Sequence, residues 1–137
     1  MKVLAIDFGM KRIGLAVGNT ELQTASPLPP IIRKNSKQAI VEIKQWIYEY
    51  EIEQIAMGYP LHMDGTASGI TEQVEHFTRR LQKSVGDSIG ITFIDERLSS
   101  FEAEETLKPI HHDYKKRKKH LDSMSALILL KRFMEIR

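Results

Sequence analysis

The stretch VLAIDFGMKRIGLAVGN, residues 3–19, places the carboxylate of Asp7 inside an apolar run and follows it with Gly9 and two cations. The β-branched, mostly apolar segments on either side of this glycine are typical of a buried β-hairpin. Burial opposes ionisation of a carboxyl group, so an acidic residue is uncommon in a core strand. We therefore interpret Asp7 as a functional residue, and the alternative is a hydrogen-bonded turn residue before Gly9.

The composition bounds the class of protein. The 137 residues are 42% hydrophobic and 28% charged, which is ordinary for a soluble globular protein and fits one domain over residues 1–137. No cysteine is present, so neither a disulfide framework nor a thiolate metal site is possible. No apolar segment approaches the ~20 residues that a membrane span needs, and the first residues lack the apolar core of a signal peptide. We expect a cytoplasmic protein with no membrane partner.

Positive charge is concentrated in the last part of the sequence. Residues 108–137 contain nine Lys or Arg against three Asp or Glu, whereas residues 1–107 contain eleven against fifteen. The run KKRKK at 115–119 dominates the basic part, and such runs bind polyanions by displacing counterions. A solvated flexible loop is the alternative interpretation. The candidate polyanion-binding residues are Lys115, Lys116, Arg117, Lys118 and Lys119.

Hydrophobic periodicity predicts a mixed α/β domain. A helix over 36–51 has Ser36 available as its N-cap, and Ser99 with Glu102 has the form of a capping box for a helix over 101–107. The other expected elements are strands at 2–8, 13–19, near 28–34, 53–60 and 90–100, helices at 70–85 and from about 121, and a loop at 109–120. This order predicts a mixed sheet, antiparallel at its start and parallel later, with helices on its faces.

Acidic residues gather at one end of this predicted sheet. Asp7 ends the first strand and Asp95 with Glu96 ends the last, and ligand sites form beyond the carboxyl ends of parallel strands. Asp122 lies in the expected first turn of the last helix, on the face of positions 125, 126, 129 and 133. Carboxylates brought together repel one another and need shared protons or cations. One or two Mg²⁺ or Mn²⁺ ions would resolve this conflict, and such ions can hold the attacking and leaving oxygens of a phosphodiester.

Two of these acids also have structural interpretations. Glu96 could form a surface ion pair with Arg97, and Asp122 could be an ordinary cap or dipole partner at a helix start. The joint placement of the acids at one end of the sheet favours a metal site over these alternatives.

Four segments resemble the signature blocks of one family. They are AIDFGMKRIGLAVGN at 5–19, AMGYPLHMDGTASG at 56–69, FIDERLSSFEA at 93–103 and KKHLDSMSALILL at 118–130. These blocks look like those of the YqgF or RuvX-type proteins, a family of pre-16S rRNA nucleases that resemble Holliday junction resolvases. The resemblance spans nearly the whole chain, in order.

The resemblance implies a ribonuclease H-like fold with a five-stranded mixed sheet flanked by helices. It implies an acidic triad, catalytic and metal-binding, at the positions matching Asp7, Glu96 and Asp122. It further implies a cytoplasmic role in maturing the 5′ end of the small-subunit rRNA precursor. Asp95 is less secure than Glu96, because adjacent strand residues face opposite ways and only one of the two would reach the metals.

Three further cations are candidate phosphate ligands. Lys11 and Arg12 leave the first strand beside Asp7, although a solvated hairpin tip is the alternative. Arg97 could pair with a carboxylate, contact the scissile phosphate, or do both.

Other polar and aromatic residues have weaker signals. The loop at 61–69 could offer the Thr66 and Ser68 hydroxyls to a nucleic-acid backbone, but these residues are also typical of turns. The five histidines show no metal-ligand spacing, so we interpret them as surface residues. The aromatic residues at helical spacing, Trp46 among them, are interpreted as core.

The leading hypothesis is a metal-dependent endonuclease acting on structured nucleic acid, with an rRNA precursor as partner and branched DNA as the alternative. A four-way-junction resolvase would require a dimer that presents two sites, and both monomer and homodimer remain open. An RNA-binding ribosome-assembly factor without catalysis would show the same basic segment. An ATP-binding sugar-kinase or actin-like protein would need a second domain and a second glycine-rich phosphate loop.

Overall fold

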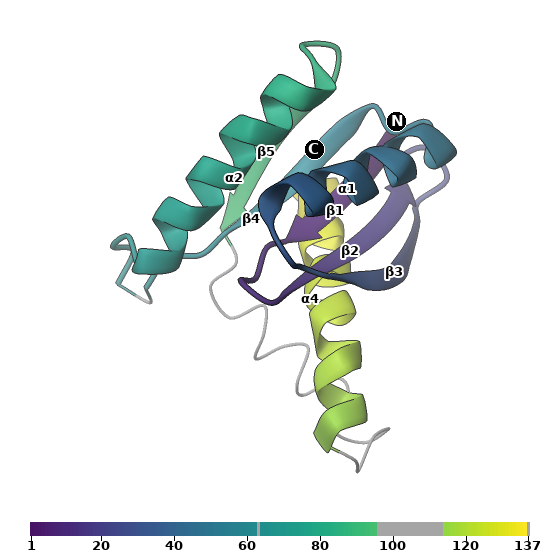
Figure 1. Cartoon of the computed structure of the whole chain (residues 1–137). Helices are drawn as coiled ribbons and strands as arrows, with labels where there is room; N and C mark the ends of the chain where they lie inside the picture. Colours follow the sequence, from purple (N-terminus) through teal and green to yellow (C-terminus); the bar gives the residue numbers. More distant parts are fainter. Residues whose placement is uncertain (63, 96–113, 137) are drawn as a thin grey trace.

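The computed structural model has a five-stranded sheet with helices on both faces (Figure 1). The structure describes residues 1–62, 64–95 and 114–136, and in the last range side chains from 124 to 135. The strands are β1 (Lys2–Asp7), β2 (Arg12–Asn19), β3 (Thr24–Ile32), β4 (Gln54–Tyr59) and β5 (Gly90–Asp95), and the helices are α1 (Ser36–Tyr50), α2 (Gly69–Val85) and α4 (Tyr114–Ile136). The expected helix at 101–107 and its capping box lie outside the described residues.

The strand order is β3-β2-β1-β4-β5. β1 pairs antiparallel with β2, and β2 pairs antiparallel with β3, whereas β1, β4 and β5 run parallel. The predicted mixed sheet is therefore confirmed. We use "carboxyl rim" for the end of the sheet at Asp7, Tyr59 and Asp95, and "amino rim" for the opposite end at Lys2, Gln54 and Gly90.

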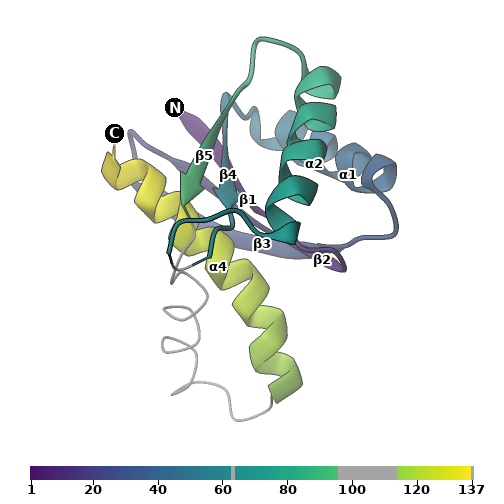
Figure 2. The same cartoon turned by 90° about the vertical axis from the view of Figure 1, so that its left-hand side faces the viewer.

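The two faces of the sheet bury separate apolar clusters. In β1, Leu4 and Ile6 pack with the apolar side chains of α1 and α2, while Val3 and Ala5 pack with those of α4. This alternation is what a strand covered on both faces requires. Figure 2 shows α1 and α2 together on one face and α4 alone on the other, which we call the α4 face.

β3 is an edge strand of the described sheet, as its prolines predict. It is longer than the expected segment near 28–34, because pairing with β2 extends back to Thr24. Pro27 lies opposite Ala16 in this pairing. Proline cannot donate a ladder hydrogen bond, so an edge position lets the strand keep its prolines without breaking the sheet.

The helix starts differ from two predictions. The N-cap of α1 is Asn35, whose Oδ1 accepts a hydrogen bond from the Gln38 backbone N–H at 2.8 Å, so the choice of Ser36 was wrong by one residue. α4 begins at Tyr114 and not near residue 121. The basic run at 115–119 is therefore helical, and the loop interpretation of that run is wrong. Lys and Arg have high helix propensity, which allows a helix to extend through a segment without apolar periodicity.

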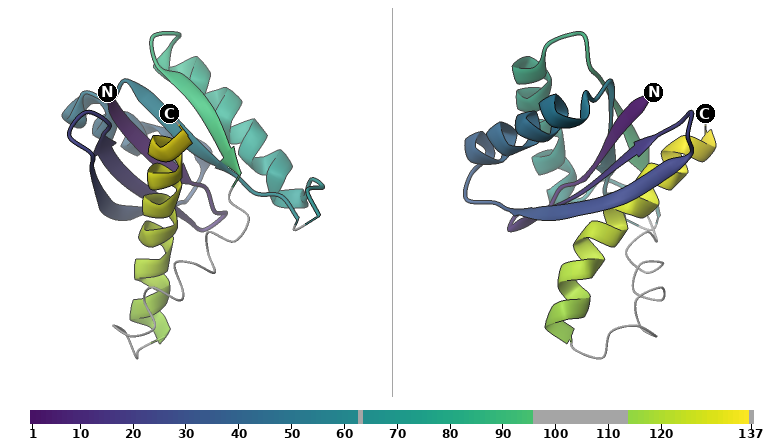
Figure 3. Two further views of the ribbon diagram at one scale, coloured as in Figure 1. Left: turned by 180° about the vertical axis from the view of Figure 1, so that it is seen from behind. Right: turned by 90° about the vertical axis from the view of Figure 1, so that its right-hand side faces the viewer.

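The two halves of α4 have different surroundings. Buried residues Ala126, Leu129, Leu130 and Phe133 pack its second half onto the sheet. Its first half extends past the sheet on the side toward which the β5 arrow points (Figures 1 and 3). Within the described residues, no helix is both long and apolar enough to cross a membrane.

Candidate functional site

Asp7 ends β1 at the carboxyl rim and is half-buried. Alternation along the strand places it on the α4 face, after Val3 and Ala5. Its register partner in β2 is Gly14, and Gly58 of β4 follows the partner of Ile6, so glycine flanks Asp7 on both sides. Glycine inside a strand often marks a place where a ligand comes close to the backbone. The two neighbouring strands therefore carry no side chain at the positions level with Asp7, and both glycines are buried.

The turn after Asp7 also requires glycine. A Cβ on Gly9 would overlap the carbonyl oxygen of Arg12, so only glycine permits the chain to reverse this tightly. Arg12 then starts β2, half-buried, and alternation with Gly14 and Ala16 puts it on the α4 face with Asp7. Lys11 is exposed at the tip of the turn. The structure thus places Asp7 and Arg12 on one face and leaves Lys11 at its margin.

The side chain of Arg33 contacts this turn and stabilises it. The sequence interpretation did not identify this residue. Its guanidinium lies 5.5 Å from the centroid of the Phe8 ring. It donates from Nη1 to the Met10 carbonyl at 3.2 Å and from Nη2 to the Ser36 Oγ at 3.0 Å. Arg33 follows β3 in the sequence, so only the pairing of β2 with β3 brings it to this turn. It is a positioning residue for the segment that carries Lys11 and Arg12.

Asp95 lies on the other face from Asp7. It ends β5 opposite Tyr59, two residues after Phe93, which lines a groove beside α2. Ile94, its neighbour, packs instead into the α4 cluster. Arg132 of α4 donates from Nη1 to the Asp95 carbonyl at 3.3 Å, which ties the last helix to the end of β5. The side chain of Asp95 is therefore not part of the Asp7 face, and Glu96 with Arg97 lies outside the described residues.

Asp122 lies inside α4, eight residues after its start at Tyr114. The expected position in the first turn is wrong, so a charge–dipole contact with the helix start does not apply, since such contacts fade within the first turn. By helical periodicity Asp122 shares a face with Ser125, Ala126 and Leu129, all of which are buried. The helix face that carries Asp122 is thus the one that packs on the sheet. Its side chain lies outside the described part.

The 61–69 loop uses its hydroxyls within the chain. Thr66 donates from Oγ1 to Asp64 Oδ1 at 2.7 Å, and its backbone N–H donates to the same oxygen at 2.9 Å. These bonds hold the pKa of Asp64 below its ordinary value. Ser68 caps α2 in a reciprocal capping box with Thr71. These bonds agree with the turn interpretation of the loop, and the phosphate-binding alternative stays a prediction.

The donor set at the carboxyl rim is compatible with a hard divalent ion at one described position. Oxygen ligands suit Mg²⁺, and Asp7 supplies a half-buried carboxylate beside two buried strand glycines. Among the described residues no three His, Cys, Asp or Glu side chains come together as a metal-binding group. His62 and His76 are exposed, as expected. The glycines Gly14 and Gly58 were overlooked in the sequence, where two strand glycines level with an acid would have been a usable signal.

Comparison with protein families gives a match over almost the whole chain. The family model described as "RuvX: Holliday junction resolvase" matches residues 1–136. A protein of Buchnera aphidicola subsp. Baizongia pistaciae named "Putative pre-16S rRNA nuclease" is 40% identical over 130 residues, covering 95% of this chain and 93% of the relative.

Two solved structures share the fold. The Holliday junction resolvase of fowlpox virus has a TM-score of 0.58 and 15% identity, with all of both chains covered. Thermus thermophilus RuvC in complex with a Holliday junction substrate has a TM-score of 0.57 and 12% identity, covering 99% of this chain and 96% of that one. Identities this low speak only for the architecture, and that architecture is the ribonuclease H-like fold.

Proposed function

The chain belongs to the RuvX family and is a nuclease, and from this we propose that it is a metal-dependent endonuclease that processes the 5′ end of the pre-16S rRNA. The observation that carries the proposal is Asp7, a half-buried carboxylate at the carboxyl rim between two strand glycines. Burial opposes the ionisation of a carboxyl group, so an acid retained at this position of a core strand favours a functional role. We place its action in the cytoplasm, where ribosomal precursors are processed.

The catalytic residues of this proposal are Asp7, Glu96 and Asp122. One or two Mg²⁺ or Mn²⁺ ions held by these carboxylates would supply Lewis-acid polarisation of the scissile phosphate. Asp7 fixes one ligand position relative to the rigid sheet, because β1 is paired on both sides. The packing of α4 on the sheet would bring Asp122 to the same face.

The cations of this proposal act on the substrate backbone. Arg12, on the face of Asp7, would hold a phosphate next to the scissile bond, and Lys11 and Arg97 would contact neighbouring phosphates. The helical run Lys115, Lys116, Arg117, Lys118 and Lys119 would attract nucleic acid electrostatically, with an affinity that falls as salt rises. Its place on the part of α4 that extends past the sheet gives it room for a large substrate.

The rRNA precursor is proposed as substrate because the relatives carry that activity in their name. The second candidate is a four-way DNA junction, favoured by the description of the matching family. It requires two copies of the chain, each presenting one site to one of two symmetric strands. Membership of this family favours both nucleases over the ATP-binding interpretation.

One experiment separates these candidates. Purified protein is incubated with Mn²⁺ and, in parallel, with a precursor rRNA fragment that includes the 5′ processing site and with a four-way DNA junction. We expect discrete cleavage of the RNA near the mature 5′ end and none with EDTA. Cleavage of the junction alone would favour the resolvase.

The control is Asp7→Asn, which keeps the size of the side chain and removes its charge. It should bind RNA as the wild type does and lose cleavage by about 10²-fold or more. Binding by both proteins without cleavage by either would make the protein a non-catalytic assembly factor, and undiminished cleavage by the variant would remove Asp7 from the mechanism.

A further inference from the structure

A groove between α2 and β5 lies on the face of the sheet opposite Asp7. It has a volume of about 420 Å³ and is lined by Tyr59, Glu75, Thr78, Arg79, Gln82, Ile91 and Phe93. β5 is the outermost strand on this side of the described sheet, so the groove opens along an edge. None of these side chains takes part in the proposed catalysis.

The floor of the groove is aromatic. The Phe93 side chain is 42% exposed, and its ring centroid lies 4.8 Å from that of Tyr59, with the two planes tilted by 60°. Tyr59 donates from its hydroxyl to Glu75 Oε1 at 2.5 Å, and this bond raises the pKa of Tyr59. The hydrogen bond to α2 fixes the Tyr59 ring, and Tyr59 supports the exposed ring of Phe93. An exposed aromatic ring held in place by packing is a stacking platform that loses little entropy on binding.

Arg79 lines the groove, and further basic side chains lie next to it. Arg79 and Gln82 also line an adjacent hollow of about 490 Å³ on the outer side of α2, together with His76, Arg80, Lys83 and Asp87. Across the described part of the chain, the charged groups of Arg79, Arg80 and Lys83 make no hydrogen bond or ion pair. Three cations on one helix thus remain available for an anionic ligand.

The hollow on the outer side of α1 makes a useful contrast. It also has an exposed aromatic residue, Tyr48, and one lysine, Lys44, but Glu49 and Glu51 line it as well. Glu51 pairs with Lys2 at the amino rim, 2.9 Å away, so this hollow lies far from the acids of the carboxyl rim. Acids outnumber bases in this hollow, which disfavours a polyanion there. In and beside the α2 groove three cations outnumber two acids, Asp87 and Glu75, and Glu75 is already bonded to Tyr59.

We propose that the groove between α2 and β5 binds an unpaired nucleotide of the substrate, with its base stacked on Phe93 and its adjoining phosphates held by Arg79, Arg80 and Lys83. A basic surface that follows the backbone, combined with an aromatic ring for a base, is how proteins hold single-stranded nucleic acid. Tyr59 is paired with Asp95 at the carboxyl rim. A nucleic-acid strand bound at Asp7 would therefore reach the groove by crossing that rim. The inference rests on the proposed function in taking nucleic acid as the ligand.

The test is binding, measured by fluorescence anisotropy of a labelled 12-nucleotide single-stranded RNA with the full chain in EDTA. Phe93→Ala should weaken binding at least about fivefold, the lower end of the effect of removing one stacked base. Phe93→Leu keeps the apolar packing but loses the aromatic face, and it should weaken RNA binding by a similar factor. Phe93→Trp keeps an aromatic face and should bind the RNA about as tightly as the wild type does. Tyr48→Ala is the matched control and should bind as the wild type does.

The salt dependence tests the phosphate-binding cations separately. In Arg79→Gln with Lys83→Gln, the slope of log affinity against log salt should become shallower by about 0.7 for each phosphate that the variant no longer neutralises. Lys44→Gln, a cation on α1, should leave the slope unchanged. A duplex of the same sequence should be insensitive to Phe93→Leu, because its bases are already stacked.

Two outcomes overturn the inference: wild-type affinity in Phe93→Ala, or an effect of Phe93→Leu that is equal on single strand and duplex. If the wild type cuts RNA but its RNA affinity does not depend on Phe93, this inference is wrong and the proposed function still holds. The reverse result, binding that depends on Phe93 in a protein that never cuts, would defeat the proposed function alone.

Discussion

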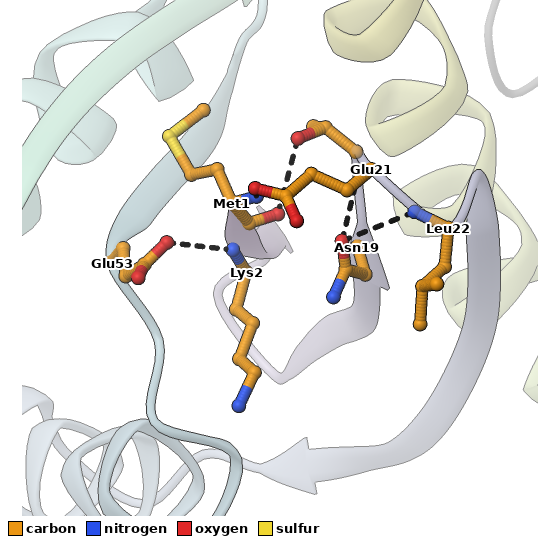
Figure 4. A network of polar contacts seen from close by, with 7 residues as sticks. Met1, Lys2, Asn19, Glu21, Leu22 and Glu53 are labelled. Atoms are coloured by element: carbon orange, nitrogen blue, oxygen red, sulfur yellow. Dashed lines mark hydrogen bonds and ion pairs between the residues drawn. The ribbon is translucent and has the colours of Figure 1, made fainter.

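Acidic side chains at the amino rim are exposed and contact the chain itself, whereas Asp7 at the carboxyl rim is half-buried between glycines. At the amino rim Glu53 Oε2 accepts from the backbone N–H of Lys2 at 3.0 Å, and Glu51 pairs with the Lys2 Nζ at 2.9 Å. Asn19 closes the β2–β3 turn by accepting from the N–H groups of Glu21 and Leu22 (Figure 4). These contacts join strand ends to each other.

The carboxyl rim is built on a different principle. The positions level with Asp7 in the neighbouring strands are Gly14 and Gly58, which carry no side chain and are both buried. The polar groups of the amino rim stabilise strand ends, while at the carboxyl rim one half-buried carboxylate lies level with two buried glycines. The comparison teaches that the role of an acidic residue depends on its neighbours more than on its residue type. Four sets of substitutions can break or sharpen that distinction.

The largest difference is expected between two acids. Asp7→Asn should lower cleavage about 10²-fold or more, since losing the proposed metal ligand would remove several kcal/mol of charge stabilisation. Glu53→Gln, at the other end of the sheet, should leave cleavage within about twofold, because its carboxylate only caps a strand. Initial rates on the precursor rRNA measure both, and equal losses would erase the distinction between the rims.

Two glycines give the next contrast. A Cβ on Gly18, near the amino rim, would overlap the Thr24 carbonyl oxygen and come within 2.9 Å of Leu130 Cδ2. Gly18→Ala should therefore cost about 1–3 kcal/mol of unfolding free energy, as overpacking does.

Gly58→Ala at the carboxyl rim adds a methyl group at a buried position beside Asp7 and should also cost about 1–3 kcal/mol of unfolding free energy. It should lower cleavage at least about tenfold, because the added methyl group would displace the groups beside Asp7 and small displacements of reacting groups are costly. Urea denaturation and cleavage rates measured on both variants decide the matter. The contrast fails if Gly58→Ala unfolds like Gly18→Ala while cutting normally.

A smaller effect is expected at Ser68. Removing the N-cap hydroxyl by Ser68→Ala should destabilise the protein by about 1 kcal/mol through the loss of the capping box of α2. RNA affinity should not change, because this hydroxyl serves the helix. Weakened RNA binding with unchanged stability would restore the phosphate-binding interpretation of the loop.

The smallest effect is expected for the exposed ion pair of the amino rim. Lys2 lowers the pKa of Glu51, chiefly through their hydrogen bond. A carboxyl pKa lowered by folding stabilises the protein above the unfolded-state value of about 4.3 and stops doing so as the pH falls through the folded value. Glu51→Gln should therefore reduce the melting temperature slightly at pH 7. The difference should vanish in acid and shrink in 0.5 M salt, and a difference that grows in acid would contradict the pairing.

Much of the architecture could be predicted from the sequence, because its signals are local. The β1–β2 hairpin, β4 and the parallel placement of β5 follow from apolar runs and the glycines between them. The start of α4 could not be found this way, since apolar periodicity is absent from Tyr114 to Lys119 and only helix propensity extends the helix there. Ser36 was confused with Asn35 because both side chains cap helices well.

The site was predictable where it depends on strand ends and unpredictable where it depends on register. Asp7 and its face follow from one strand. Its glycine neighbours and the Tyr59–Phe93 contact depend on which residues of β1, β4 and β5 lie level, and one residue of slip would exchange the faces. The assignment of Glu96 and Asp122 stays a prediction.

The place of α4 in the sequence has a consequence during synthesis. The ribosome releases all five strands before the helix that covers Val3, Ala5 and Ala16. Until Ala126–Phe133 emerge, a nascent chain exposes that apolar surface to chaperones and to other chains. The proposed catalytic acids would likewise meet only after translation has passed them, so under the proposed function an unfinished chain would not cut the RNA of the ribosomes around it.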